Sequence, residues 1–343
     1  MNINNIRTLR SATVRGYAES VNTLFRLRNM PPPTNLSDPN NMSAMLINNM
    51  LREEQIARQR APLDNNEIFA KICRVADASK TEDSANALLH DVVTLSRYIG
   101  PRLSEYAQKN QKKVDIHTYP SGLTVIKAFT TNDFIFFDSK KHIIEDLSAR
   151  SIESVAAVKI TWRIQKNRQN GQSITLMADT KSRDLCPVLS AARMVLRARR
   201  LLQPDDMPLA IYKTKKGESL YLTGGKIAEL LRGSVKRIRP DTSVEDIKRY
   251  SAHSLQVWAC VLLDESRKSP DYIKKRLRWL GDSFRMYLRD TSVIQQQHAD
   301  ALQSASQEVL NLISALPEDV IALSTTTDGM ADPNTSEYAD EMD

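Results

Sequence analysis

The apolar residues of this chain follow a helical period over most of its length. Between residues 13 and 28, Val14, Tyr17, Val21 and Leu24 fall on one face of a helix, and charged residues fall outside that face. The chain is therefore predicted to be mainly α. Further helices are expected at about 43–59, 66–78, 84–99, 187–203, 225–238, 244–265, 270–280, 282–290 and 292–315.

Short runs of β-branched and aromatic residues interrupt this period in the middle of the chain. Two of them, 155–165 and 173–178, flank "KNRQNGQ" (166–172), whose Asn-Gly pair favours the tight turn of a hairpin. The other two runs lie at 122–129 and 133–138. One small antiparallel sheet is therefore expected within an otherwise helical domain.

Two segments rich in proline and asparagine divide the N-terminal part of the chain. "PPPTNLSDPNN" (31–41) predicts a connection between helices, and "APLDNN" (61–66) predicts a boundary between domains. We expect an all-α N-terminal domain, a mixed α/β domain, a C-terminal helix and an acidic disordered tail. Their expected bounds are 1–62, 63–291, 292–324 and 325–343, respectively.

The charge is distributed unevenly. The whole chain has a formal charge of +7, but residues 325–343 contain six acidic residues and no Lys or Arg, so the rest carries +13. Such a basic body is typical of proteins that bind a polyanion, with nucleic acid ahead of membrane. Solvated Lys and Arg faces would explain the same charge equally well.

The cysteine spacing and the hydropathy of the chain argue against a zinc-binding, disulfide-bonded, secreted or membrane protein. The three cysteines form no C-x-x-C pair, so neither a zinc site nor a disulfide framework is indicated. The N-terminus lacks the apolar core of a signal peptide, and the apolar run 257–263 is too short to span a membrane. We therefore expect an intracellular protein that acts wherever its partner lies, without a membrane, metal or cofactor.

Two segments carry cations suited to phosphate chemistry. In "GPRLSE", Arg102 follows a Gly-Pro turn at the start of a helix, and Glu105 lies one turn later. In the predicted hairpin loop, Lys166 could protonate a leaving alkoxide, and Arg168 is an alternative to it. By itself, an Arg–Glu pair at this spacing is more often a surface ion pair.

Two later segments carry a histidine and a tyrosine. His253 begins "HSLQVWACVLL", where it could transfer protons near neutral pH, although such a histidine is usually packed or capped. Tyr287 lies on the short helix expected between Gly281 and residue 290, with Asp282 as the expected cap. Arginines surround Tyr287 in the sequence and would favour its phenolate form and attract a DNA backbone.

The order of these segments resembles the tyrosine recombinase, or phage integrase, family. The resemblance rests on "GPRLSE" and on the 34 residues between His253 and Tyr287, and it covers roughly residues 60–300. It implies a mainly α fold with a small antiparallel sheet. It also implies DNA integration or site-specific recombination of a mobile element through a 3′-phosphotyrosyl intermediate. The partner would be double-stranded DNA bound by a homotetramer, with no small-molecule substrate.

The resemblance assigns a role to each residue that matches the family's pattern. Tyr287 would attack the scissile phosphate, Arg102 would bind its non-bridging oxygens, and Lys166 would protonate the leaving oxygen. His253 would act in proton transfer, and Glu105 would support His253.

The chain departs from the family's pattern in its second and third boxes. The second box reads His-x-x-Arg in the family, and here Gln256 replaces the arginine. Losing one stabiliser of a developing oxyanion typically costs about 10²–10³ in rate. The third box has a His or Trp about nine residues before the tyrosine, where this chain has Arg278 followed by Trp279. Either residue is a candidate for the phosphate contact.

Gln256 leaves several interpretations open. The protein is a slow recombinase, or a neighbouring arginine such as Arg249 supplies the charge, or the chain is an inactive, site-specific DNA-binding protein with the recombinase fold. A monomeric enzyme that relaxes DNA, similar to the type IB topoisomerases, is a more distant alternative. The long stretch between Arg102 and His253 also predicts an insertion at about 110–160.

Overall fold

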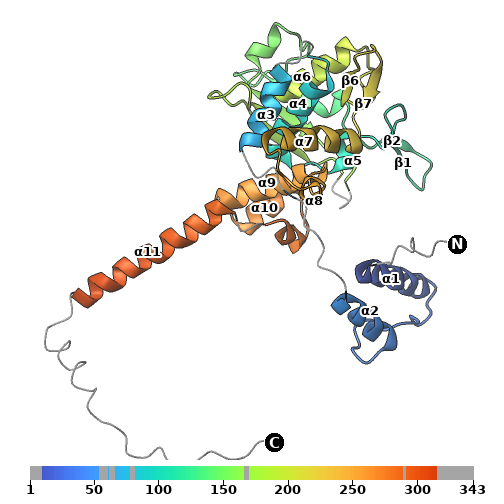
Figure 1. The fold of residues 1–343 in the computed structure, drawn as a ribbon. Helices are drawn as coiled ribbons and strands as arrows, with labels where there is room; N and C mark the ends of the chain where they lie inside the picture. Colours follow the sequence, from blue (N-terminus) through green and yellow to red (C-terminus); the bar gives the residue numbers. More distant parts are fainter. Residues whose placement is uncertain are drawn as a thin grey trace, which may run out of the picture. The chain divides into compact units, whose positions relative to one another are not determined.

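A computed structural model gives the fold of the chain (Figure 1). The chain divides into two compact units, Met1–Gln59 and Arg60–Asp343. No described helix is long and apolar enough to cross a membrane. The structure describes residues 10–53, 61, 66–77, 82–165, 170–288 and 291–314.

Two amphipathic helices make up the described part of the first unit. They are α1 (Ser11–Leu27) and α2 (Met42–Glu53), as the apolar period predicted. The connection between them is fixed by Asn22, a buried residue of α1 whose Nδ2 donates to the Thr34 carbonyl oxygen at 2.8 Å. The predicted segment 31–41 is therefore a loop tied to the first helix.

The second unit is built around α4 (Ala85–Ile99), which is buried over most of its length. Ser84 caps its start by accepting a hydrogen bond from the Ala87 amide, and Gly100 ends it in the left-handed region at φ +49°. Helices α3 (Asn66–Asp77), α6 (Pro187–Arg200) and α9 (His253–Glu265) pack against α4. The other helices are α5 (Leu103–Tyr106), α7 (Gly224–Ile238), α8 (Val244–Ile247), α10 (Pro270–Leu277) and α11 (Ser292–Ser314), with short 3₁₀ helices η2 (Thr131–Asp133), η3 (Ser151–Ser154) and η4 (Asp282–Tyr287).

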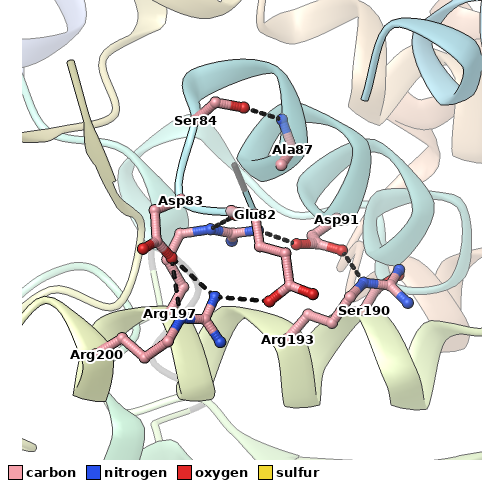
Figure 2. Close-up of polar contacts among 9 residues, drawn as sticks. All are labelled: Glu82, Asp83, Ser84, Ala87, Asp91, Ser190, Arg193, Arg197 and Arg200. Atoms are coloured by element: carbon pink, nitrogen blue, oxygen red, sulfur yellow. Dashed lines mark hydrogen bonds and ion pairs between the residues drawn. The ribbon is translucent and has the colours of Figure 1, made fainter. Parts of the chain in front are cut away.

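A buried ion-pair network fastens α6 to α4 (Figure 2). Asp91 of α4 is 1% exposed and accepts from Arg193 Nε and Arg197 Nη2, both at 2.6 Å. Arg197 Nε also donates to the carbonyl oxygen of Glu82 at 2.8 Å. The buried Asp91 carboxylate is thereby paired with two guanidinium groups, and a buried charge requires such a partner.

The described residues contain three small antiparallel sheets, where the sequence predicted one. The predicted runs form a three-stranded sheet in the order β3-β4-β5 and contribute β2 to a separate hairpin with β1. The third sheet, β6–β7, was not predicted, because each of its strands has only three residues and gives little alternation to detect. The strands are β1 (Ile116–Thr118), β2 (Thr124–Ile126), β3 (Phe134–Phe137), β4 (Ala157–Thr161), β5 (Ser173–Met177), β6 (Ile211–Lys213) and β7 (Ser219–Tyr221).

The helix predicted at 244–265 is interrupted. It consists of α8, which ends at Ile247, and α9, which begins at His253. Arg232 donates to the carbonyl oxygens of Tyr250 at 2.9 Å and Lys248 at 3.2 Å, so these carbonyls have partners outside a helix. The break places His253 at a helix start.

The segment that carries Tyr287 also differs from the prediction. Arg278, in the left-handed region at φ +60°, ends α10, whereas Gly281 was expected to do so. The predicted helix at 282–290 is the 3₁₀ helix η4, and no side chain caps its start, so the predicted cap by Asp282 is wrong. Arg278, whose side chain is buried, takes the C-cap position of α10 three residues before Gly281.

Candidate active site

Three segments that are far apart in the sequence meet at Gly100. A Cβ atom on Gly100 would lie 2.8 Å from Leu277 Cδ2 and 3.4 Å from Ala259 Cβ, so the end of α4 is in close contact with α10 and α9. Arg102 follows Gly100 by two residues, and Arg278 follows Leu277 directly. The absence of a side chain at Gly100 therefore lets the two arginines approach each other.

Glu105 lies between these arginines and is 4% exposed. Its Oε2 accepts hydrogen bonds from the Arg102 backbone amide at 3.0 Å, from Trp162 Nε1 at 3.1 Å and from Arg278 Nη2 at 2.8 Å. Arg102 Nη1 lies 3.7 Å from the other oxygen, Oε1. The resemblance assigned Glu105 to His253, whereas these hydrogen bonds make it the shared partner of two arginines.

Arg278 is the more enclosed of the two arginines, at 6% exposure. Its Nη1 donates to the Ile99 carbonyl oxygen at 3.2 Å, and its Cζ lies 3.8 Å from the centre of the Trp162 ring. Arg102 Nη2 lies 3.4 Å from the Arg278 carbonyl oxygen. Burial lowers the pKa of the Arg278 guanidinium and the charge of Glu105 opposes that shift, so the group remains a cation at neutral pH.

Trp162 is a site residue that the sequence reasoning missed. It directly follows β4, holds Glu105 through its indole N–H and supports Arg278 with its ring. The available signal was a tryptophan in "TWRIQ", at the end of a buried strand and four residues before Lys166. A tryptophan in such a strand is ordinarily assigned to the core, where Trp162 also belongs at 2% exposure.

The start of α9 is held close to α5. The hydroxyl of Tyr106 donates to the Ala252 carbonyl oxygen at 3.3 Å, one residue before His253. Burial raises the pKa of Tyr106, so its hydroxyl remains a proton donor. Gln256 lies one helical turn after His253 and is buried. The second box is therefore anchored beside the first.

Tyr287 lies on η4 in contact with two aromatic rings. Its ring centre is 5.1 Å from that of His253, nearly edge to face, and 5.2 Å from that of Trp279. Tyr287 and Trp279 pack on a small apolar cluster that includes Leu277 and Phe284. The Trp279 Nε1 is buried, and no described residue accepts a hydrogen bond from it. The structure thus places the predicted nucleophile, the histidine and a free indole donor together.

A pocket of about 280 Å³ opens beside Arg278. Its wall includes the ring of Trp162, and its charged lining residues in the described part of the chain are all cations: Lys275, Arg276 and Arg278. The Arg276 guanidinium has its pKa lowered by burial, with Tyr272 opposing the shift. A wall of one sign of charge favours an anion at this edge of the site.

Three predicted residues remain: Lys166, Arg168 and Arg249. Lys166 and Arg168 fall outside the described residues. Arg249, considered as a substitute for the missing arginine, has Nη1 3.4 Å from Asp246 Oδ1 on an exposed surface. Within the described ranges, no group of three His, Cys, Asp or Glu side chains is placed to hold a metal ion.

Comparisons with known proteins identify structures but no sequence relatives. No family model matches the sequence, and no curated protein matches it. The chain is similar to the XerA recombinase, with 10% identity, a TM-score of 0.40 and coverage of 85% of this chain and 83% of that one. It is similar to the integrase of transposon Tn1549 in complex with transposon right end DNA, at 13% identity and a TM-score of 0.44, covering 87% and 81%. The XerH site-specific recombinase bound to difH substrate gives 11%, 0.39, 87% and 72%.

These structures are of recombinases and an integrase. The case for a function rests on the side chains of this chain.

Proposed function

We propose that this protein is a site-specific DNA recombinase of a mobile element that cleaves double-stranded DNA with Tyr287. The observation that carries the proposal is the contact of Tyr287 with His253 and Trp279, beside two arginines that share Glu105. A tyrosine, a proton-transfer group and cations held by a buried carboxylate are what phosphoryl transfer to a hydroxyl requires. The basic body of the chain would bind the DNA backbone.

In the proposed reaction, the Tyr287 oxygen forms a bond to the scissile phosphorus while the bond from phosphorus to the 5′ oxygen breaks. His253 takes the phenol proton, and Lys166 gives a proton to the leaving 5′ oxygen. Arg102 and the Trp279 indole N–H bind the non-bridging oxygens as negative charge builds on them. Of the two third-box candidates, we therefore assign the contact from that box to Trp279. The 3′-phosphotyrosyl bond conserves the energy of the phosphodiester for rejoining.

Assembly into a homotetramer on DNA is also proposed. The apolar side chains of α11 include Val293 and Leu302, which are exposed. Exposed apolar side chains on a long helix are suited to packing on a second copy of the chain. Analytical ultracentrifugation with and without DNA would test this, since a monomer on DNA would contradict it.

The first experiment traps the covalent intermediate on nicked duplex DNA that contains the ends of the element. Wild type is expected to form a protein–DNA adduct that is stable to denaturation, and Tyr287→Phe is expected to form none. Tyr212→Phe is the matched control, because it removes the hydroxyl of a buried tyrosine on β6 and should leave the adduct unchanged. An adduct that persists in Tyr287→Phe would refute the assignment of the nucleophile.

Gln256 favours a second candidate function, that of an inactive, site-specific DNA-binding protein. A buried amide in place of a charged arginine removes a stabiliser of the transition state without changing the fold. Specific DNA binding with no adduct in wild type would support this alternative. Relaxation of supercoiled DNA without strand exchange would instead indicate an enzyme similar to the type IB topoisomerases.

A further inference from the structure

We infer that Arg278 supplies the second positive charge of the phosphate site, in place of the arginine that Gln256 replaces. The inference rests on the proposed function and deepens it. On this inference, the positive charge that is absent at position 256 is present at position 278 of the same site. The two departures from the family's pattern are then related.

The first observation is the balance of charge around Glu105. This buried carboxylate is shared by Arg102 and Arg278, at 3.7 Å and 2.8 Å from its oxygens. Arg102 and Arg278 together carry one more positive charge than Glu105 neutralises. Without Arg278, Glu105 would neutralise Arg102, and no net charge would remain at this point of the site.

The second observation is the backbone of Arg278. Its φ of +60° lies in the left-handed region, which a residue with a side chain adopts only at a cost. A glycine three residues later, Gly281, could have ended α10 without that cost. The surrounding contacts hold Arg278 in this conformation, through Glu105, the Ile99 carbonyl oxygen and the ring of Trp162. Such strain is typical of functional positions.

The third observation is the place of Gln256. It lies one helical turn before Ala259, the α9 residue in contact with Gly100 and close to Leu277. Gln256 therefore lies on the side of α9 that contacts Gly100, and Arg102 and Arg278 closely follow Gly100 and Leu277 in the chain. An arginine at 256 would add a third guanidinium group to the helices that meet at Gly100. A neutral amide at 256 avoids that repulsion.

The fourth observation is access for an anion. The pocket of about 280 Å³ beside Arg278 also has Lys275 and Arg276 among its described lining residues, and these cations would attract a DNA phosphate. Arg278 would thus be a positioning residue for Arg102 through Glu105 and a source of charge for the phosphate. The two roles are distinguished by whether an arginine at position 256 can replace the charge of Arg278.

The experiment is rescue by charge transfer, measured as the rate of adduct formation on the nicked duplex. Arg278→Gln is expected to lower the rate by about 10²-fold or more. Gln256→Arg in the Arg278→Gln background is expected to restore at least about tenfold, because the charge returns to the other side of the site. Arg199→Gln is the control for the loss of an arginine elsewhere, since Arg199 donates to the Leu147 carbonyl oxygen. Its rate should equal that of wild type.

Each outcome decides the inference. If Arg278→Gln is folded but Gln256→Arg does not rescue it, Arg278 only positions Glu105 and the inference is overturned. If wild type is inactive and Gln256→Arg alone forms a Tyr287-dependent adduct, the wild-type site lacks a positive charge that the reaction requires. The inference then fails while the proposed chemistry stands. If no variant forms an adduct, the proposed function fails and the inference fails with it.

Discussion

Replacing Glu105 with glutamine tests whether this carboxylate holds the site together. The change keeps the shape of the side chain and removes the one negative charge that Arg102 and Arg278 share. Removing one partner of a buried ion pair costs about 3–5 kcal/mol. The amide oxygen of glutamine can still accept one or two of the three hydrogen bonds, so we expect a loss at the lower end, about 3 kcal/mol.

The assay is urea unfolding followed by tryptophan fluorescence, because Trp162 is in contact with both Glu105 and Arg278. A matched control is Glu153→Gln, which breaks an exposed pair with Arg183 in the same unit. Glu153 is 60% exposed, so its loss should leave the midpoint unchanged. Equal shifts of the two midpoints, or no shift for Glu105→Gln, would show that Glu105 stabilises the fold no more than an exposed carboxylate does.

Two further substitutions test the packing around the site and the network behind it. Gly100→Ala should lower the free energy of unfolding by about 2–4 kcal/mol, since a left-handed alanine costs about 1–2 kcal/mol and the contact with Leu277 adds about as much. Urea midpoints measure this loss, and a loss below about 1 kcal/mol would contradict the prediction. Asp91→Asn should cost about 3–5 kcal/mol by leaving Arg193 and Arg197 without their shared carboxylate. Thermal unfolding measures this loss, and an unchanged melting temperature would show that the network is not stabilising.

Local pattern was sufficient to predict most helices and the residue types of the site. The apolar period predicted α4, α6 and α7 with ends within a few residues, because each helix has one face that must be buried. The period failed at 244–265, where the apolar pattern continues across a break made by a distant side chain, Arg232. An interruption imposed by tertiary contacts leaves no trace in a local pattern.

The candidate site, like the fold, was predicted from the sequence only in part. Arg102, Glu105, His253 and Tyr287 were selected by their order along the chain, and the structure brings the first two together and the last two together. The role of Trp162 and the sharing of Glu105 could not be predicted. Both depend on distances between side chains from β4, α5 and the end of α10, which only the folded chain determines.

The two halves of the site rest on different parts of the apolar core. Trp162, which contacts Glu105 and Arg278, belongs to the large core cluster, whereas Tyr287 and Trp279 pack on a small cluster around Leu277 and Phe284. Among the described residues this second cluster buries less apolar surface, so opening it costs less free energy than unfolding the whole unit. We therefore expect Tyr287 to change position more readily than Arg102, Glu105 and Arg278. Leu277 belongs to the small cluster and touches Gly100 at the end of α4, so this contact couples the two halves. We accordingly expect Gly100→Ala to lower the rate of adduct formation even under conditions where the protein remains fully folded.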